Sequence, residues 1–423
     1  MNPVVAARPA VWRFRWIVCT LLFFATVIAY VDRGVLAYLE QTLEKLIGFN
    51  KEQYSYMTAA FQAAYAIGLV SAGRLTDRLG TRKGFAIAIT LWSIAAMLPG
   101  TATSVATFGF AMFLLGLGEA ANFPACIKTV AEWFPKRERA LATGIFNSGA
   151  NVGAIVVPAV VPFLTLTFGW RGAFFATGAL GFVWLACWLL LYDKPETHRR
   201  ISAAELAYVR SDPPEKIASV AWLRILPLRE TWAFAVAKFF SDPIWWFYLF
   251  WLAPYLQETF HLDIKQNRLP VIVAYSLSCI GSIAGGWLSG YLLKRGISVN
   301  LARKSALLIC ALAVLPVLYA PYSHNLWIVV GLVGLAMAAH QGWSANLFTL
   351  PSDMFPRAAV ASVVGFGGMV GSAGGVLFQL IAGRIVQATH SYLPLFLVAG
   401  SAYLVGLGIV QLLTPRLAPA RLD

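Results

Sequence analysis

Six ionisable side chains lie inside long apolar stretches of the sequence. They are Asp32, Arg33, Glu119, Lys128, Lys238 and Asp242. A charged residue at the centre of an apolar helix costs roughly 2.5–3.5 kcal/mol on insertion scales, so such residues are functional candidates. A carboxyl group in a cavity of low dielectric can bind and release protons near neutral pH, and a guanidinium can bind a carboxylate. The six residues are therefore candidates for anion binding and proton transfer.

Arg33 is the strongest candidate for anion binding. It follows Tyr30 by about one helical turn, so the two side chains share a face. Its planar guanidinium fits a carboxylate through two hydrogen bonds. A snorkelling cation, or a structural ion pair with Asp32, is the alternative interpretation. Asp32 and Glu119 are the candidate proton carriers, and for Asp32 a fixed ion pair with nearby cations is the alternative.

A second group of candidates lies in the later part of the chain. Lys238 and Asp242 are one helical turn apart, and Trp245 follows. Lys238 is interpreted either as a second cation facing a ligand or as the partner of Asp242. The aromatic faces of Trp245 and of Trp246 beside it suit the apolar C–H face of a sugar ring, although lipid-facing bulk explains the same residues. Further side chains able to bind hydroxyl groups are Asn147, His340, Gln341, Ser344 and Asn346, and His340 either titrates near neutral pH or is neutral and hydrogen-bonded.

The elements that carry these residues are predicted to be membrane-spanning helices. Of the 423 residues, 59% are apolar and 12% are charged, against about 45–50% and about 25% in soluble domains. This composition excludes a soluble enzyme. Twelve apolar runs are long enough to cross a bilayer: 14–38, 53–75, 84–102, 105–131, 140–165, 172–192, 232–256, 269–293, 303–321, 325–350, 359–387 and 392–414. The predicted fold is an all-α membrane protein of twelve transmembrane helices in two pseudo-symmetric six-helix bundles.

The division into two bundles follows from a repeat and from one long polar connection. EWFPKRERALATG at 132–144 matches DMFPRAAVASVVG at 353–365. We expect an N-terminal bundle at 1–192, a linker at 193–231 and a C-terminal bundle at 232–423. Two six-helix repeats are a transporter architecture with the substrate near the midplane.

The excess of cations sets the orientation of the chain. The net charge is +14, and basic residues mark cytoplasmic loops. Beside the linker, these loops hold Arg78, Arg82, Lys83, Lys136, Arg137, Arg139, Lys294 and Arg295. Both termini are therefore expected to be cytoplasmic, and the charge does not indicate nucleic acid.

No cofactor or metal is expected. The five cysteines lie inside apolar runs without a metal-ligand spacing. No GxxxxGK[ST] phosphate loop occurs, which argues against an ATP-driven pump.

The loop GRLTDRLGTRK at 73–83 resembles the signature loop between helices 2 and 3 of the major facilitator superfamily. The resemblance implies a latch on the cytoplasmic face that gates transport. Its candidate residues are Gly73, Asp77, Arg78, Gly80 and Arg82.

Longer blocks resemble the bacterial hexuronate-transporter branch of the anion:cation symporter family. They are YVDR at 30–33, AAFQAAYAIG at 59–68, the stretch 116–149 and AHQGWSANLFTLPSDMFP at 339–356. The resemblance implies proton-coupled uptake of sugar-acid monoanions such as galacturonate or glucuronate, by a monomer in the bacterial inner membrane. Uptake of another organic anion (an aldonate, aldarate or aromatic acid) and drug/proton antiport remain alternatives.

The same resemblance assigns roles to individual residues. It implies that Arg33 binds the substrate carboxylate with Tyr30 and Tyr65 as neighbouring contacts, that Lys238 faces the cavity, and that Asp32 and Glu119 couple protons. One position departs from the pattern, because Met112 stands where relatives carry an arginine seven residues before the glutamate. Glu119 therefore lacks that charge partner within its own helix.

Overall fold

The computed structural model describes residues 14–211 and 222–420, and the regular elements of these residues are all helical. The first part of the chain forms α1 (Phe14–Tyr38), α2 (Glu40–Ile47), α3 (Lys51–Leu79), α4 (Thr81–Met97), η1 (Leu98–Thr101), α5 (Val105–Glu119), α6 (Asn122–Trp133) and α7 (Lys136–Leu191). Two short helices follow, α8 (Ala203–Val209) and α9 (Trp222–Ile225). The later part forms α10 (Arg229–Phe260), α11 (Arg268–Lys294), α12 (Val299–Val314), η2 (Leu315–Tyr322), α13 (Leu326–Leu347), α14 (Thr349–Met354), α15 (Arg357–Thr389) and α16 (Leu393–Leu413).

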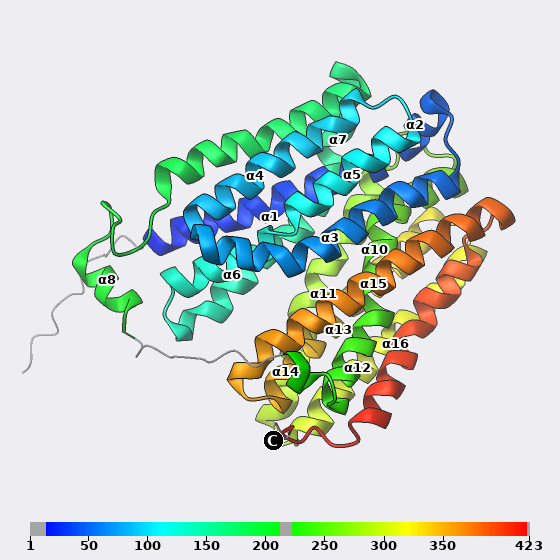
Figure 1. Ribbon diagram of the computed structural model, residues 1–423. Helices are drawn as coiled ribbons and strands as arrows, with labels where there is room; N and C mark the ends of the chain where they lie inside the picture. Colours follow the sequence, from blue (N-terminus) through cyan, green and yellow to red (C-terminus); the bar gives the residue numbers. More distant parts are fainter. Residues whose placement is uncertain (1–13, 212–221, 421–423) are drawn as a thin grey trace, which may run out of the picture.

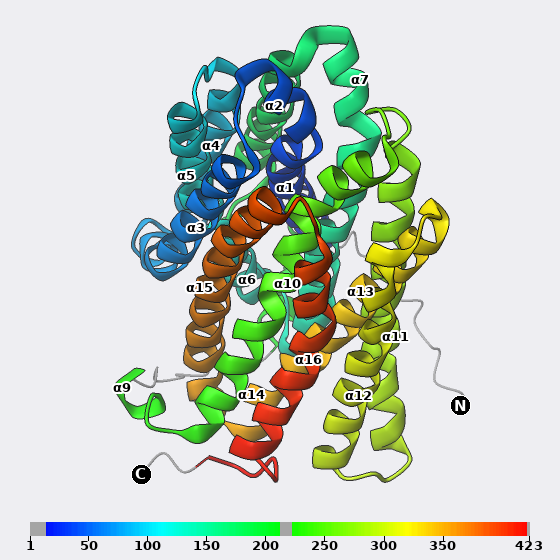
Figure 2. The same ribbon diagram turned by 90° about the vertical axis from the view of Figure 1, so that its right-hand side faces the viewer.

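The long helices pack in two groups, which Figure 1 and Figure 2 show as two lobes. In the first group, α1 and α4 pack on α7, and α3 packs on α5. In the second group, α11 packs on α13, and α10 packs on α15 and α16. The groups meet where α3 contacts α15, α7 contacts α11 and α1 contacts α10. Residues carried by α1, α3, α7, α10 and α11 therefore meet between the two groups.

Prolines explain where two long helices are interrupted. α5 ends at Glu119, and the N–H that would bond to the carbonyl of Ala120 is missing because residue 124 is a proline. α13 ends at Leu347, and Pro351 likewise has no N–H to donate to the Leu347 carbonyl. The first break places Glu119 at a helix end.

The repeat predicted from the sequence occupies equivalent places in the two groups. Pro135 precedes α7 and Pro356 precedes α15, each with extended backbone at the start of the helix. α7 is interrupted at Gly169, whose φ of 73° is outside the helical range. The chain turns back there, as Figure 2 shows at the top of the view.

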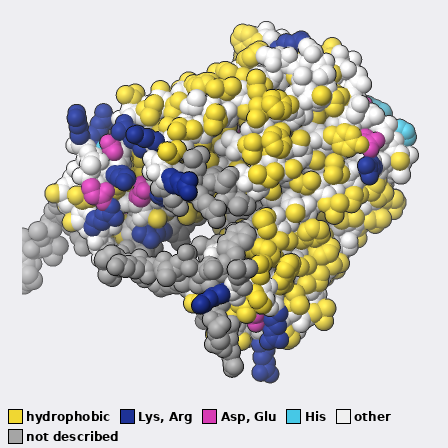
Figure 3. All heavy atoms as spheres, in the orientation of Figure 1, with side chains coloured by type: hydrophobic (Ala, Val, Ile, Leu, Met, Phe, Trp, Pro, Cys, Tyr) yellow, Lys and Arg dark blue, Asp and Glu magenta, His cyan; other side chains and the backbone are white. Residues whose placement is uncertain are grey.

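Nine helical segments of the described residues are long and apolar enough to cross a membrane. The side of the molecule seen in Figure 3 carries a broad area of apolar side chains, while charged side chains gather toward its two ends. Exposed apolar side chains of the described residues include Phe163, Ile283 and Leu412, and exposure of such bulk is typical of a lipid-facing surface.

The two ends of the molecule are distinct. At one end, which we call the α8 end, the backbone N–H of Phe14 donates to Glu205 of α8 at 3.0 Å, and that of Ala420 donates to the Met354 carbonyl at 2.7 Å. α1 therefore starts, and the described chain finishes, at the same end. α2 lies at the opposite end, which we call the α2 end (Figure 1).

Polar contacts join the two groups at the α2 end. The Tyr38 hydroxyl donates to the Ile264 carbonyl at 3.0 Å, and the Tyr54 hydroxyl donates to the Phe250 carbonyl at 2.7 Å. From these contacts the lobes diverge toward the α8 end (Figure 1).

Candidate functional site

Arg33 lies between the two groups of helices, inside a box of aromatic rings. Its guanidinium carbon is 4.5 Å from the ring centroid of Tyr30, 4.8 Å from Tyr65, 5.4 Å from Phe61 and 5.6 Å from Trp246. We call these five residues the Arg33 box. Ring faces attract a cation, and the attraction grows when water is excluded, as it is for this 2% exposed arginine. The structure thus brings Tyr30 and Tyr65 to Arg33, as the sequence predicted.

Phe61 and Trp246 complete the box; Phe61 was not predicted as a site residue, and Trp246 was predicted only as a ring for a sugar and not as a neighbour of Arg33. Phe61 lies one turn before Tyr65 in α3, and the two rings stack at 6.0 Å. Trp246 comes from α10, so the second group of helices closes the box. Phe61 could have been predicted, because it precedes Tyr65 by one helical turn in α3. Which of the adjacent Trp245 and Trp246 faces Arg33 depends on how α10 packs.

Glu119 is the ionic partner of Arg33. The guanidinium Nε donates to Glu119 Oε2, and the second carboxylate oxygen, Oε1, has no hydrogen-bond partner among the described residues. Met112 is buried in the same helix and supplies no charge. The missing charge partner within α5 is therefore replaced by an arginine of α1, through a contact that crosses between helices.

This ion pair limits what Arg33 can do. The hydrogen bonds described for the guanidinium use only its Nε, so its two Nη groups are the donors left for the fork of a carboxylate ligand, whose charge would share the cation with Glu119. A ligand carboxylate and Glu119 thus compete for one cation.

Asp32 precedes Arg33 in α1 and is 3% exposed. Neither of its carboxylate oxygens has a hydrogen-bond partner among the described residues, and none of the ion pairs described involves it. Burying an ionised carboxylate without partners is costly, and a proton on the carboxyl group removes that cost. The described residues thus show no fixed ion pair for Asp32, and proton binding by it stays a prediction.

Lys238 pairs with Asp242 in α10. Its Nζ lies 2.8 Å from Asp242 Oδ2 and 4.4 Å from the ring centroid of Phe348, and the lysine is 5% exposed. The structure therefore has Lys238 as the partner of Asp242, the second of its two interpretations from the sequence. Lys238 is nevertheless within electrostatic reach of His340.

His340 and Trp245 form a second aromatic cluster in the later group of helices. The Nδ1 of His340 is 2.7 Å from the Tyr403 hydroxyl, and its ring stacks on Trp245 at 5.3 Å and 13°. One face of Trp245 is thus covered by the imidazole. A stacked and hydrogen-bonded histidine matches the neutral interpretation of His340.

Amide groups of α7 and α13 meet across the interface. Gln341 Nε2 donates to Asn151 Oδ1 at 3.0 Å, and the Ser278 hydroxyl donates to the same oxygen at 3.4 Å. Asn151 was missed from the sequence, although it follows the predicted Asn147 by one turn and shares its face. Asn147 is exposed on that face.

Two further predicted residues of α13 differ in role. Asn346 Nδ2 donates to the carbonyls of Gly285 and Gly342, each at 2.9 Å, so this amide holds α11 against α13. Ser344 is half-buried one turn after His340. Of the α13 candidates, Gln341 is the one that reaches the other group of helices.

The predicted latch loop lies between α3 and α4. Gly80 has a φ of 76°, which ends α3 and is readily adopted by glycine. Arg82 pairs with Asp193 at 3.3 Å and donates to the Leu189 carbonyl at 2.8 Å, while Arg78 is exposed. Gly73 and Asp77 fall within α3, but their side chains lie outside the described residues.

Comparison with known proteins gives consistent matches. The family model described as Major Facilitator Superfamily matches residues 22–379. The hexuronate transporter of Escherichia coli K12 is 30% identical over 400 residues, which are 93% of this chain and 92% of the relative. The D-galactonate transporter of Escherichia coli CFT073 is 27% identical over 417 residues, 96% of each chain.

Solved structures match the fold as well. A bacterial homologue of the human lysosomal transporter Spinster, in an inward-facing and occupied conformation, aligns with a TM-score of 0.76 at 16% identity. The alignment covers 97% of this chain and 98% of that chain.

Proposed function

This chain belongs to the Major Facilitator Superfamily, and we propose that it is a proton-coupled importer of sugar-acid monoanions such as galacturonate and glucuronate. It is a multi-pass membrane transporter and not an enzyme. The observation that carries the proposal is the Arg33 box, a buried cation between the two groups of helices that already holds one carboxylate.

The proposed topology has twelve spans with both termini in the cytoplasm. Beyond the nine segments of sufficient length and apolarity, α7 contains two rods separated at Gly169, and α3 and α10 are long enough to span. Arg78 in the last turn of α3, Arg82 in the first turn of α4 and Arg295 directly after α11 lie toward the α8 end, which the positive-inside rule assigns to the cytoplasm. The proposed membrane is the bacterial inner membrane, which the bacterial origin of the relatives supports.

The two groups of helices are proposed to act as the moving bundles, 1–192 and 232–423, joined by the linker 193–231. The polar contacts at the α2 end hold them together there, while the lobes diverge toward the α8 end (Figure 1). In the proposed cycle the two bundles separate at the α8 end, and substrate release there completes alternating access. A single chain contains both bundles, so the monomer is the proposed unit.

Substrate recognition is assigned to groups around the interface. Arg33 binds the carboxylate, and the faces of Tyr30, Tyr65 and Trp246 contact the apolar side of the sugar ring. The hydroxyl groups are bound by the amides of Asn147, Asn151 and Gln341, with Lys238, Trp245, His340, Ser344 and Asn346 supporting the wall formed by α10 and α13.

In this proposal, competition between the substrate carboxylate and Glu119 for Arg33 couples substrate binding to proton uptake. When the substrate carboxylate takes the guanidinium, Glu119 loses its cation and takes up a proton, and Asp32 is the second acidic group. One proton per monoanion removes the electrical cost of entry, which is about 2.3 kcal/mol per 100 mV in a cell with a negative interior. Further protons let the membrane potential drive uptake.

Uptake into proteoliposomes tests this function. We expect galacturonate or glucuronate to accumulate when the lumen is made alkaline, and R33A and R33K to lose accumulation at least about 100-fold, because lysine keeps the charge but not the planar fork. Arg171→Lys, at an exposed arginine of α7, is the matched control and retains uptake.

A panel of sugar acids under separate pH and voltage gradients identifies the substrate. Preference for an aldonate would place the chain beside the D-galactonate transporter instead. Wild-type rates in R33A would contradict the assignment of Arg33, and a panel without any transported acid would contradict the substrate class.

A further inference from the structure

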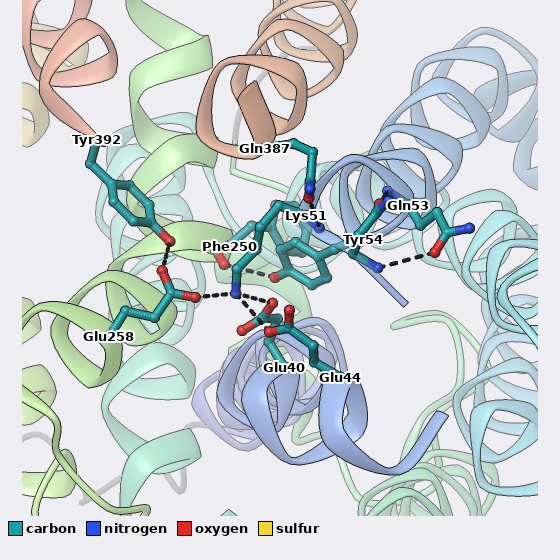
Figure 4. Close-up of polar contacts among 10 residues, drawn as sticks. Glu40, Glu44, Lys51, Gln53, Tyr54, Phe250, Glu258, Gln387 and Tyr392 are labelled. Atoms are coloured by element: carbon teal, nitrogen blue, oxygen red, sulfur yellow. Dashed lines mark hydrogen bonds and ion pairs between the residues drawn. The ribbon is translucent and has the colours of Figure 1, made fainter. Parts of the chain in front are cut away.

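A cluster of charged residues joins the two groups of helices at the α2 end (Figure 4). Lys51 is the first residue of α3, and its Nζ lies 2.6 Å from Glu40 Oε1 and 3.0 Å from Glu44 Oε2. The same ammonium forms an ion pair with Glu258 of α10. Two of its carboxylate partners thus come from α2, and the third comes from the opposite group of helices.

Two further hydrogen bonds hold the cluster in place. The backbone N–H of Lys51 donates to Gln387 Oε1 at 3.1 Å, and the Tyr392 hydroxyl donates to Glu258 Oε2 at 2.8 Å. Gln387 belongs to α15 and Tyr392 precedes α16, so three elements of the second group contact the start of α3 and its partners. The cluster exists only while the two groups are closed on each other at this end.

The charges in the cluster do not balance. The carboxylates of Glu40, Glu44 and Glu258 surround the single ammonium of Lys51. This ammonium occupies the position in which three carboxylates could otherwise hold a metal cation. Glu40 is 0% exposed, and its Oε2 has no hydrogen-bond partner among the described residues. A buried carboxylate oxygen without a donor is unfavourable, and a proton on the carboxyl group removes the excess negative charge.

Burial raises the pKa of Glu40 from its ordinary value to about 7, although Lys51 acts in the opposite direction. The carboxylates of Glu44 and Glu258 raise this pKa further. Glu258 lies beside Glu40, and Glu40 is fully buried, only while the two groups are in contact at this end. Separation of the groups should therefore return the pKa of Glu40 toward the ordinary value of a glutamate.

We propose that Glu40 is a proton-binding site whose occupancy stabilises closure at the α2 end, where Lys51 bridges Glu40 and Glu258. The proposal rests on the alternating access of the proposed function, but not on the identity of the substrate. The groups that face Glu40 are Glu44 of α2, Lys51 and Tyr54 of α3, Glu258 of α10 and Tyr392 before α16. The site senses the pH on the α2 side, because closure seals it away from the opposite compartment.

The direction of the pH effect follows from linkage. The closed state has the higher pKa at Glu40 and binds more protons, so closure is favoured as the pH falls through about 7 and is lost as the pH rises above it. Between about pH 8 and about pH 5, the ratio of closed to open molecules should increase by a factor on the order of 50.

Distance measurement between two spin labels tests the site without any substrate. The labels replace Leu46 of α2 and Leu269 of α11, which are exposed residues of opposite groups, in protein whose five cysteines have been replaced. We expect wild-type protein in nanodiscs to shift toward the short distance as the pH falls. Glu40→Gln imitates the protonated carboxyl, so it should stay closed across the range and lose the response.

Glu52→Gln is the matched control. It removes an ion pair with Arg384 that also joins the two groups, at 3.2 Å, but both side chains are partly exposed and Glu52 is not buried in the cluster. This variant should keep the wild-type pH response. Glu258→Gln leaves Glu40 in place but removes the inter-group carboxylate, so its midpoint should move to lower pH.

Three outcomes would overturn the proposal. They are a wild-type pH response in Glu40→Gln, an α2 end that opens at every pH in that variant, and an unchanged midpoint in Glu258→Gln. Because no sugar acid is present, failure of sugar-acid uptake would leave these readouts intact and would contradict only the proposed substrate.

Discussion

At the scale of single residues, the proposed cycle has one guanidinium serve two carboxylates in turn. Arg33 holds Glu119 in the structure, and in the proposal a substrate anion draws on the same positive charge. The aromatic faces around Arg33 keep the cation favourable when water is excluded. Exchange of one carboxylate for another at a fixed cation couples anion binding to protonation without requiring a large local movement.

Glu119→Gln separates coupling from binding. The amide keeps the shape of the side chain but cannot exchange a proton, so we expect proton-driven accumulation to be lost while counterflow exchange of sugar acid continues. Accumulation and counterflow are measured in the same proteoliposomes. Equal loss of both activities would indicate a structural role for Glu119 instead.

Asn151 tests the interface amides. Asn151→Ala leaves the partly buried Gln341 amide without its acceptor, and an unsatisfied donor costs about 1–3 kcal/mol, so the KM for sugar acid should rise roughly 10-fold. A double-mutant cycle with Gln341→Ala should be non-additive, because the two residues share one hydrogen bond. Strictly additive effects in the uptake assay would contradict a joint role.

At the scale of helices, small residues set how closely α1 and α7 approach. A Cβ added at Gly153 would lie 2.6 Å from the Tyr30 Cβ and 2.7 Å from the Val27 carbonyl oxygen. α7 can therefore contact α1 directly only with glycine at this position, and the contact positions Tyr30 beside Arg33.

Two glycine substitutions in α7 should have opposite effects. Gly153→Ala forces α7 from α1 and should destabilise the purified protein by about 1–3 kcal/mol, with loss of uptake. Gly144→Ala has open space around the new methyl group, and alanine favours the helix by about 1 kcal/mol, so its melting temperature should stay equal or rise. Equal melting temperatures for both variants would contradict the packing argument.

At the scale of the whole molecule, the orientation in the membrane decides which compartment each end faces. Single cysteines in place of Leu46 at the α2 end and Arg295 at the α8 end report this directly, since both positions are exposed. A membrane-impermeant maleimide should label the first in intact cells and the second only after permeabilisation. The reverse pattern would invert the proposed topology and the side sensed by Glu40.

Local sequence determined most of the architecture. Apolar runs of spanning length, the Phe-Pro repeat at 134–135 and 355–356 and the basic loops depend on neighbours along the chain, and the membership in the Major Facilitator Superfamily that they indicated is confirmed. Arg33 was also evident, because a cation in an apolar helix stands out against its surroundings.

Tertiary structure alone decided the partners. Glu119 is 86 residues from Arg33, and Trp246 rather than adjacent Trp245 faces the guanidinium, because adjacent residues of a helix point about 100° apart and only packing selects one of them. Lys51, which pairs with Glu40, also pairs with Glu258 from the other group of helices. Such pairings arise when helices distant in sequence meet, and no periodicity within either helix encodes them.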